Sequence, residues 1–580
     1  MLRRLIILAV VFAWPLTLAA RDMQLEPEAA TGTEQKALVT AEHHMVVAAH
    51  PLAAEAGRDI LRKGGSAVDA AIATQLVLGL VEPQSSGLGG GAFIVHWDNA
   101  AKTVTTYDGR ETAPAAATPD RFLIDGAPMD FPDAVHSGLS VGVPGVVRAM
   151  ELAHAKHGKL PWAELFAPAI QLAETGFAMP ARLHNLLKLQ GPENFSLPAR
   201  DYFFTADGNP KPAGTVMQNA AYAATLKALA ANGAKAFYEG PIAEAIVAAV
   251  AAAPITKADL TLADIARYQA KERAAVCFAY RANKICGMGP PSSGGLTVAQ
   301  TLKLIEPFAQ VLGPANAMSV PALHIIAEAE RLAYADRNRY IGDPDVVTVP
   351  DSLLDDGYLA ERRKLINVDK AMEPPQAGLP PGVSKRTYGD DATKERAGTS
   401  HMSIVDDQGN AVAMTTTIEG AFGSHLWAAG FLLNNELTDF SFQPADADGV
   451  VAANAVAGGK RPRSSMAPTL IFDDHGALKG VTGSPGGSRI IMYVVKNLVA
   501  MLDWGMNPQE AAATMNFGSD GQAFYFELNP QFVFKALALK GYGHTLSAEL
   551  MTSGVHTILR RDGRLEGGAD PRREGVALGD

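Results

Sequence analysis

Apolar positions recur with a helical period over much of the first two-thirds of the chain, whereas β-branched runs dominate the last third. The helical pattern predicts helices at residues 51–63, 67–80, 145–157, 162–175, 220–252, 296–305, 323–338 and 490–502. Short apolar runs predict strands at residues 43–49, 92–97, 103–107, 403–405, 411–417, 431–434, 469–472 and 478–482. This order favours an α+β fold in which helices pack on both sides of stacked sheets.

A predicted β-hairpin follows a polar segment near the middle of the chain. Its strands, 403–405 and 411–417, flank Asp407-Gln-Gly-Asn410, whose residue types favour a turn. Residues 373–396 are rich in Pro, Gly and charge, as is typical of a loop or processing linker. Cleavage after Gly398 would give Thr399 a free α-amine beside its own hydroxyl, which places a nucleophile and its base in one residue.

Composition sets the class of protein. Hydrophobic residues make up 48% and charged residues 19% of the 580, so a large buried core is expected. The net charge of −11 argues against nucleic acid as a partner, since phosphate binding needs a basic face.

Residues 1–20 have Arg3 and Arg4, an apolar run and then small residues, which predicts a secretory signal peptide and no stable membrane anchor. We therefore expect a secreted protein, with the periplasm as its compartment.

The two cysteines lie close together in sequence. Cys277 and Cys286 flank a predicted hairpin turn at residues 281–283, so a cross-strand disulfide and two buried free thiols both fit. Two cysteines with no histidine nearby do not favour metal binding, and we expect no metal.

Three other motifs lack the structural context that their function requires. The Gly-rich segment 87–92 precedes a predicted strand instead of a helix, and no Lys-Ser/Thr pair follows it, so neither phosphate-binding loop is predicted. Residues 138–142 match Gly-x-Ser-x-Gly, but Val-Pro-Gly follows where a nucleophile elbow needs a helix. Structural or surface roles are predicted for four histidines: His43, His44, His50 and His401.

Several segments together resemble the γ-glutamyltransferases (γ-glutamyltranspeptidases), a family of N-terminal-nucleophile hydrolases. Thr-Ser-His-Met-Ser-Ile-Val-Asp at Thr399 and Leu-Leu-Asn-Asn-Glu, which ends at Glu436, resemble the start of the family's small subunit. Other family-like segments occur in the family's order: Ala67-Val-Asp-Ala-Ala, Gly87-Leu-Gly-Gly-Gly-Ala-Phe, Asp108-Gly-Arg-Glu-Thr-Ala-Pro, Tyr334-Ala-Asp-Arg, Lys460-Arg-Pro-Arg-Ser-Ser-Met and Thr482-Gly-Ser-Pro-Gly-Gly-Ser-Arg. The resemblance extends over about residues 43–520.

The resemblance implies an αββα N-terminal-nucleophile hydrolase sandwich, formed by two chains from one precursor. Residues 21–398 would be the large subunit and residues 399–580 the small subunit, sharing one domain. No cofactor is implied.

The resemblance also implies the catalytic groups. The precursor would cut itself between Gly398 and Thr399, and Thr399 would then carry the acyl group as an ester. Thr417 resembles the residue that orients this nucleophile. Gly486 and Gly487 resemble the pair near the developing oxyanion, where backbone N–H groups can approach closely.

The implied acyl donor is glutathione or another γ-glutamyl amide, and the acceptor is water, an amino acid or another amine. By resemblance Arg110 binds the α-carboxylate of the donor, which suits the fork geometry of a guanidinium. Ser464 and Ser465 would add hydroxyl donors, and Glu436 and Asp439 would receive the α-ammonium.

Two departures from the family pattern leave alternatives open. Glu419 occupies a position that is usually Asn, so a third carboxylate joins the predicted ammonium site. The loop between Phe440 and Asn454 is short and has no Tyr, which predicts an incomplete lid and favours water as the acceptor. An acylase for another side chain, such as a cephalosporin-type glutaryl group, is one alternative, and a non-catalytic binding relative is the other.

Overall fold

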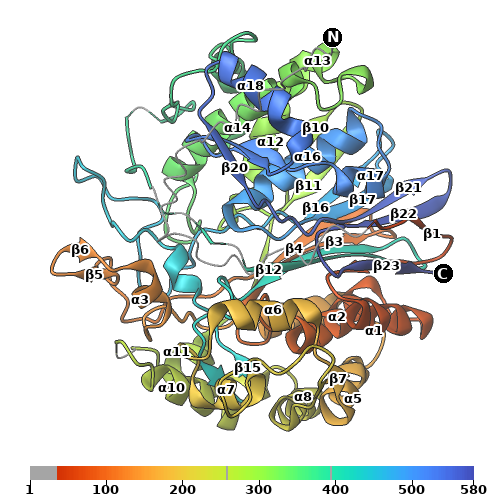
Figure 1. Ribbon diagram of the computed structural model, residues 1–580, viewed down its shortest axis with the longest axis vertical. Coiled ribbons are helices and arrows are strands. Elements are labelled where there is room, and N and C mark those ends of the chain that lie inside the picture. The colour runs from red at the N-terminus through yellow and green to blue at the C-terminus, as the bar shows by residue number, and fades with distance from the viewer. Residues whose placement is uncertain (1–34, 257–258, 384, 392, 394, 397) are drawn as a thin grey trace, which may run out of the picture.

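Two seven-stranded sheets are stacked at the centre of the computed structural model, which describes residues 35–256, 259–383, 385–391, 393, 395–396 and 398–580 (Figure 1). The predicted signal peptide lies outside these residues. The first sheet has the order β23 (Val576–Gly579), β2 (Met45–Ala48), β12 (Thr399–Val405), β13 (Ala411–Thr417), β3 (Gly91–Asp98), β4 (Thr103–Gly109), β9 (Lys271–Arg273). The second has the order β1 (Val39–Ala41), β22 (Arg564–Ala569), β21 (His556–Arg561), β17 (Leu478–Gly483), β16 (Thr469–Phe472), β11 (Asn283–Gly287), β10 (Val276–Tyr280).

Helices cover the outer face of each sheet (Figure 1). The first sheet packs against α1 (Pro51–Arg62), α2 (Ala67–Val81) and α4 (Val146–His157). On the second sheet lie α12 (Gly294–Ile305), α16 (Ile490–Leu502) and α17 (Pro508–Ala513), with α14 (Val320–Tyr340) packed on α12. The predicted αββα sandwich is therefore confirmed.

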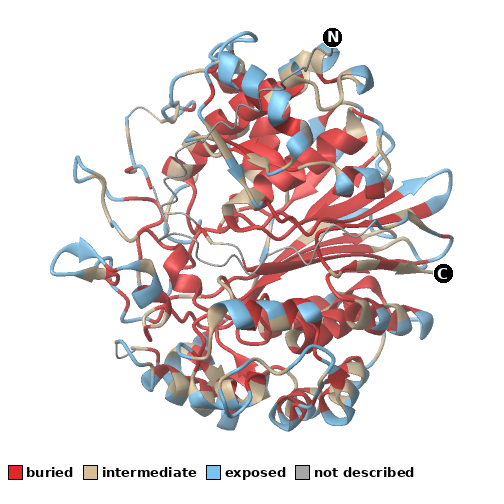
Figure 2. Cartoon of the chain, in the orientation of Figure 1, coloured by how far each residue is buried: buried red, intermediate tan, exposed pale blue. Residues whose placement is uncertain are grey.

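The central strands of the first sheet, β2, β12, β13 and β3, are buried on both faces, as the red central layer in Figure 2 shows. Successive residues point to opposite faces of a strand, so β2 places Val46 in the core under the helices and Met45 and Val47 in the core between the sheets. This double burial explains why β12 and β13 consist almost entirely of buried residues.

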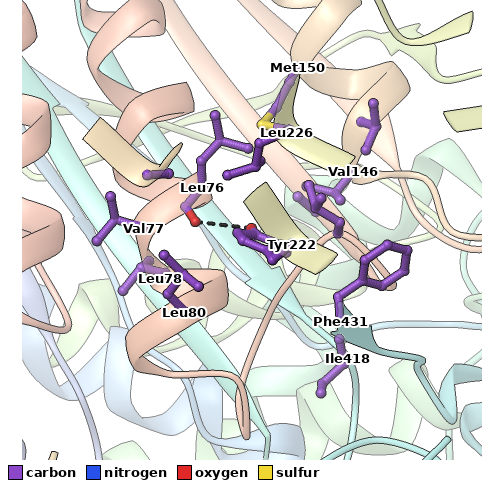
Figure 3. Close-up of a cluster of buried hydrophobic side chains, with 14 of the residues drawn as sticks. Leu76, Val77, Leu78, Leu80, Val146, Met150, Tyr222, Leu226, Ile418 and Phe431 are labelled. Atoms are coloured by element: carbon purple, nitrogen blue, oxygen red, sulfur yellow. Dashed lines mark hydrogen bonds between the residues drawn. The ribbon is translucent and has the colours of Figure 1, made fainter. Parts of the chain in front are cut away.

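A dense part of the helix-side core is drawn in Figure 3. There Leu76 of α2 and Met150 of α4 lie near Tyr222 and Leu226 of α8 (Ala220–Asn232). The hydroxyl of Tyr222 donates a hydrogen bond of 3.0 Å to the carbonyl oxygen of Leu76, so this buried polar atom is satisfied.

Several predicted elements differ from the structure in their limits, and the physical reason is clear for two of them. The helix predicted at residues 220–252 is divided into α8, α9 (Lys235–Tyr238) and α10 (Pro241–Ala251), with Gly233 and Gly240 at positive φ between them. Strand β12 begins at Thr399, four residues before the predicted strand, because it pairs with β13 along its whole length.

The remaining elements complete the fold in chain order, and their bounds are β5 (Leu123–Ile124), β6 (Ala127–Pro128), α3 (Phe131–Val135), α5 (Ala167–Thr175), β7 (Phe177–Ala178), α6 (Ala181–Gln190), α7 (Leu197–Phe203), β8 (Val216–Met217), α11 (Leu262–Arg267), α13 (Ala309–Leu312), α15 (Asp356–Arg363), β14 (Trp427–Ala428), β15 (Phe431–Leu432), β18 (Phe517–Ser519), β19 (Phe524–Glu527), α18 (Val533–Gly541) and β20 (Leu546–Glu549). Across the described residues, no helix combines the length and apolar character that crossing a bilayer requires.

The structure decides between the two cysteine alternatives. Cys277 on β10 and Cys286 on β11 are directly opposite each other in the antiparallel pair, and they form a disulfide. The disulfide lies on the second sheet, away from the β12–β13 hairpin that carries Thr399.

Candidate active site

The β12–β13 hairpin places the two predicted catalytic threonines side by side. Thr399 is the first residue of β12 and is paired with Thr417, the last residue of β13. The chain is continuous from Gly398 to Thr399, so the structure describes the protein before the predicted cleavage. Both threonines are buried.

The hydroxyl of Thr417 contacts the bond that is predicted to be cut. It donates a hydrogen bond of 2.6 Å to the carbonyl oxygen of Gly398 and accepts one of 2.7 Å from the amide of Glu419. A β-carbon on residue 398 would lie 1.7 Å from the carbonyl oxygen of Glu419, so only glycine fits there. The carbonyl at the predicted cleavage site is thus held by a hydrogen-bond donor that also polarises it.

A cavity of about 10 Å³, close to the space that one water needs, adjoins Thr399. Its lining contains most of the predicted site residues, namely Arg110, Thr399, Thr417, Glu419, Glu436, Asp439, Ser464, Ser465 and Gly487. Gly486 does not line it. Four further lining residues, Glu395, Arg396, Met466 and Ile490, were absent from the sequence prediction.

Two of these, Glu395 and Arg396, come just before the predicted cleavage site, and we call them the plug residues. The amide of Ser488 lies 3.5 Å from the carbonyl oxygen of Glu395. A β-carbon on Gly487 would lie 2.4 Å from the carbonyl oxygen of Arg396. The plug residues therefore lie against the turn that begins α16, where backbone N–H groups have no partner within the helix.

Arg110 joins the predicted substrate residues into one buried charge cluster. Its guanidinium forms ion pairs with Glu436 and, at 2.5 Å, with Asp439. Burial opposes the charge on Arg110, but these carboxylates and that of Glu111 together raise its pKa above the ordinary value. Burial also raises the pKa values of Glu436 and Asp439, although Arg110 acts in the opposite direction.

Glu419 has an unusual position in this cluster. It has φ +73°, in the left-handed region that suits Asn better than Glu. One carboxylate oxygen accepts a hydrogen bond of 3.2 Å from the amide of Arg396, and the other accepts one from Asn435. Burial and the charge of Glu436 raise the pKa of Glu419 to about 7.

Glu111 is a member of the cluster that sequence reasoning missed. Its side chain is fully buried, and burial together with the charge of Glu436 raises its pKa well above the ordinary value. A protonated Glu111 can donate a hydrogen bond to Glu436 and so lower the number of negative charges beside Arg110. The sequence feature that could have identified Glu111 is its position directly after Arg110 in the Asp-Gly-Arg-Glu segment.

Two further buried arginines, Arg337 and Arg463, hold the plug residue Glu395. The carboxylate of Glu395 forms an ion pair with Arg337 and lies 3.4 Å from Nε of Arg463. Arg337 also donates a hydrogen bond of 2.7 Å to the hydroxyl of Ser465. Burial acts against ionisation of Glu395, but the two arginines hold its pKa below the ordinary value.

The motifs that sequence reasoning set aside have structural roles. The hydroxyl of Ser140 is buried and donates to the carbonyl oxygens of Val135 and Ser137, so it is not a nucleophile. Strand β3 begins at Gly91, where a phosphate-binding loop would need a helix. His401 is buried against the hydroxyls of Thr415 and Ser403, and His50 accepts a hydrogen bond from Leu52 at the start of α1.

The remaining two histidines also agree with the prediction. His44 pairs with Asp407 at 2.9 Å, and His43 is exposed.

One buried group contains residue types that ligate metals. His324, Glu328 and His544 lie close together, but the facing ring nitrogens of the two histidines are 2.7 Å apart, at hydrogen-bond distance. Glu328 pairs with Arg331 at 2.7 Å and accepts from the amide of Met372. These groups satisfy one another, which indicates a structural cluster.

Known proteins resemble this chain in sequence and in overall fold. A family model described as gamma-glutamyltranspeptidase matches residues 53–580. The chain belongs to the γ-glutamyltranspeptidase family. This membership confirms the predicted family and the prediction that the protein is an enzyme.

Individual relatives match over nearly the whole chain. A protein of Escherichia coli (strain K12) named glutathione hydrolase proenzyme is 38% identical over 94% of this chain and 93% of the relative. A protein of the same name from Bacillus subtilis (strain 168) is 35% identical, with the same coverage. The solved structure of a cephalosporin acylase from Bacillus halodurans superposes with a TM-score of 0.82 at 27% identity, covering 96% of this chain and 99% of the acylase.

Proposed function

We propose that this protein is a self-processing γ-glutamyltransferase and glutathione hydrolase whose nucleophile is Thr399. The observation that carries the proposal is the hydrogen bond from Thr417 to the carbonyl oxygen of Gly398, at the edge of a cavity that contains Arg110, Glu436 and Asp439. Cleavage would divide the chain into residues 21–398 and 399–580. The relatives named proenzymes support a precursor that matures in this way.

Processing follows from the position of Thr399. Its hydroxyl attacks the carbonyl carbon of Gly398, the C–N bond breaks, and the acyl group moves from nitrogen to oxygen. The proton of the hydroxyl goes to the departing nitrogen. Water then hydrolyses the ester, which leaves a carboxylate on Gly398 and a free amine on Thr399. The Thr417 hydroxyl polarises the carbonyl during attack.

The mature nucleophile would act with its own base. The new α-amine has an ordinary pKa of roughly 7.7–8.0, so it can accept the hydroxyl proton near neutral pH. Attack on a γ-glutamyl amide releases the amine and forms an ester on Thr399, and water or an acceptor amine then releases the glutamyl group. We assign oxyanion stabilisation to backbone N–H groups at Gly486 and Gly487, beside the start of α16.

Charges in the cavity support a γ-glutamyl group. Among the described residues Asp439 Oδ1 has no hydrogen-bond partner, although it is buried, and an α-ammonium can supply the missing donor. Glu436 and Glu419 are two further carboxyl groups that line the same cavity. Arg110, Ser464 and Ser465 would bind the α-carboxylate.

The location and the lid are further parts of the proposal. Residues 1–20 would direct export to the periplasm, where the disulfide Cys277–Cys286 is compatible with the oxidising environment. The short loop after Phe440 contacts residues before the cleavage site, since the amide of Gly389 donates to the carbonyl oxygen of Val451 at 2.9 Å. An incomplete lid would favour water over an amino acid as the acceptor.

Glu419 supports a second candidate, an acylase for a dicarboxylic side chain. With a pKa raised to about 7, a protonated Glu419 can donate a hydrogen bond to a neutral or anionic group in place of an ammonium. The likeness to a cephalosporin acylase is compatible with this candidate. Glutaryl-p-nitroanilide distinguishes it, because that donor keeps the carboxylate and lacks the ammonium.

The first test is intact mass and N-terminal sequencing of purified wild type, with Thr399→Ala and Thr399→Ser beside it. We expect two wild-type chains, one beginning at Thr399, an uncut Thr399→Ala chain, and at least partial processing of Thr399→Ser because serine keeps the hydroxyl. The processed protein should release p-nitroaniline from γ-glutamyl-p-nitroanilide faster than from glutaryl-p-nitroanilide. A wild-type chain that stays single, or a preference for the glutaryl donor, would contradict the proposal.

A further inference from the structure

One edge of the space between the two sheets is open and forms a pocket of about 550 Å³, a volume suited to a small ligand. The first sheet contributes Trp97 of β3 and Val104 of β4, and the second sheet contributes Phe472 of β16. The rings of Trp97 and Phe472 are in edge contact, with their centroids 4.7 Å apart. None of the described residues lines both this pocket and the cavity beside Thr399, so the two sites are separate.

The register of the second sheet places the disulfide in the wall of this pocket. Cys277 lines the pocket and pairs directly with Cys286 of β11. Lys284, two residues before Cys286, also lines the pocket and pairs directly with Phe472. Directly paired residues share a face of a sheet, as do residues two apart on one strand. The disulfide therefore lies on the face of the second sheet that carries Phe472.

The two sulfur atoms differ in their access from the pocket. Cys277 is exposed on β10, which is the edge strand of the second sheet. Cys286 is fully buried on β11, between β10 and β16. Thiol–disulfide exchange needs access to the sulfur that is attacked. A thiolate in the pocket therefore reaches Cys277, and Cys286 is the leaving group.

Basic side chains give this pocket a charge opposite to that of the whole chain. Lys102 and Lys284 line it and are exposed, and His475 also lines it. Among the described residues of the lining there is no Asp or Glu, although the chain has 61 Asp and Glu against 50 Lys and Arg. Lys102 donates to the side-chain oxygen of Asn99 at 2.9 Å, and no ion pair of either lysine occurs in the part of the chain that the structure describes. Both ammonium groups are thus available to a ligand, and the pocket favours an anion.

Lys284 lies near the sulfur that would leave. It is two residues from Cys286 on the same face of β11. A positive charge close to a thiol stabilises its thiolate, and a more stable thiolate leaves faster. The lysine that attracts an anionic ligand is therefore also placed to assist opening of the disulfide.

We propose that this pocket binds a small anionic thiol and that Cys277 takes up its sulfur in a mixed disulfide. The thiolate of the ligand attacks Sγ of Cys277, and the bond between Cys277 and Cys286 breaks as the new S–S bond forms. The electron pair of the broken bond leaves on Sγ of Cys286, which takes a proton from solvent. The sulfur of the ligand is oxidised and that of Cys286 is reduced, so no other oxidant or reductant is needed.

Glutathione belongs to this class of ligand, and so does the cysteine peptide that remains when its γ-glutamyl group is removed. Both carry a thiol and at least one carboxylate. The proposed ligand would therefore be present wherever the proposed donor is. The inference goes beyond the proposed function, because it concerns a second site with its own chemistry.

The kinetic test compares two thiols in the opening of the disulfide: 2-mercaptoethanesulfonate, which is anionic, and 2-mercaptoethanol, which is neutral. Released protein thiols are trapped by alkylation and counted by intact mass, and each rate constant is expressed per thiolate. We expect the anionic thiol to react roughly tenfold faster or more with wild type, and the preference to disappear in Lys102→Gln/Lys284→Gln. Neither thiol has a γ-glutamyl group, so the result does not depend on the proposed function.

Lys479→Gln is the matched control. Lys479 donates a hydrogen bond of 2.8 Å to the side chain of Asn283, next to Lys284, but it does not line the pocket. Its replacement removes the same charge, and the preference for the anionic thiol should remain. Equal rate constants for the two thiols with wild type, or a preference that the double variant keeps, would overturn the proposal.

A second measurement locates the adduct. Cys286→Ala removes the leaving sulfur and leaves Cys277 as a thiol, which is then treated with the symmetrical disulfide of 2-mercaptoethanesulfonate. We expect one adduct at Cys277, and its crystal structure should place the sulfonate within ion-pair distance of Lys102 or Lys284. Absence of an adduct, or a sulfonate directed to solvent away from both lysines, would overturn the site.

Discussion

The hydroxyl of Thr417 lies between the carbonyl oxygen of Gly398 and the amide of Glu419, and both contacts are shorter than 3 Å. Because the hydroxyl accepts from the amide, its own hydrogen is directed to the carbonyl. The same hydroxyl is beside the amine that cleavage would create. One side chain is thus placed to act both in processing and in turnover.

Removal of this hydroxyl should slow processing. We expect Thr417→Ala to lengthen the half-life of the uncut chain by roughly a hundredfold or more, since loss of one donor at a developing oxyanion costs about 2.7–4 kcal/mol in other enzymes. Thr417→Ser keeps the donor and should process at close to the wild-type rate. Densitometry of the uncut chain during incubation measures both, and equal rates for Thr417→Ala and wild type would exclude the polarising role.

The carboxyl of Glu419 should make the precursor less stable as pH rises. Its folded pKa of about 7 exceeds the ordinary 4.5, so between these values the folded state binds more protons than the unfolded state. The stabilisation from neutral Glu419 is complete below about pH 4.5 and is lost as pH rises to about 7. At pH 8 the Glu419→Gln derivative of the uncut Thr399→Ala protein should therefore have a larger free energy of unfolding than its Thr399→Ala parent, by about 1–3 kcal/mol. At pH 4.5 the two proteins should have similar free energies of unfolding.

Urea unfolding at the two pH values measures this difference. The Thr399→Ala parent and its Glu419→Gln derivative differ only in the titrating group, so each is the control for the other. A stability difference that is the same at pH 4.5 and pH 8 would show that Glu419 does not titrate in this range.

At the scale of elements, the β12–β13 hairpin depends on Asp406 at its turn. One carboxylate oxygen accepts from the amides of Gln408 and Asn410, and the other accepts from the side chain of Asn410 and from the amide of Ala67, the first residue of α2. A hydrogen bond thereby connects the turn that sets the hairpin register to the start of a helix in the outer layer. The sequence predicted the turn but not this hydrogen bond between Ala67 and Asp406.

Asp406→Ala should destabilise the hairpin and the protein. It leaves the buried amide of Ala67 and the half-buried amide of Asn410 without their acceptor, and a buried unsatisfied amide costs about 1–3 kcal/mol. We expect a lower thermal midpoint and slower processing, because the hairpin carries Thr399. Asp406→Asn keeps one acceptor oxygen, so its thermal midpoint should lie between those of wild type and Asp406→Ala. An unchanged midpoint for Asp406→Ala would contradict this role.

At the scale of the whole molecule, the predicted cut falls inside a shared sheet. Strands β12 and β13 come after the cut, and they pair with β2 and β3, which come before it. The second sheet is mixed in the same way, because β11 pairs with β16 and β1 pairs with β22. Each predicted chain alone would expose the edges of strands from both sheets.

The two processed chains should therefore stay associated without a covalent bond. We expect them to elute together near the position of the uncut Thr399→Ala protein in size-exclusion chromatography, and to separate only under denaturing conditions. The disulfide joins Cys277 to Cys286 within the large chain, so reduction should not release either chain. Separation of the chains in native buffer would contradict the shared-sheet interpretation.

Local pattern by itself determined the elements and the order of the motifs. Strand β13 and helix α16 have the predicted limits, because a run of β-branched residues and a continuous apolar run specify their own periodicity. Family resemblance then selected Arg110, Glu419, Glu436, Asp439, Ser464 and Ser465, all of which line the cavity beside Thr399. What these residues do in catalysis stays a prediction.

Only the tertiary structure decided which distant charges meet. Glu395 is 58 residues from Arg337 and 68 from Arg463, and a polar linker gives no local sign that one of its carboxylates is buried. Glu111 likewise gains its raised pKa from burial beside Glu436, which lies in another part of the chain. The choice of a disulfide over free thiols also depended on the register of β10 and β11. Ionisation and pairing depend on burial and on neighbours across the fold, and periodicity in one segment specifies neither.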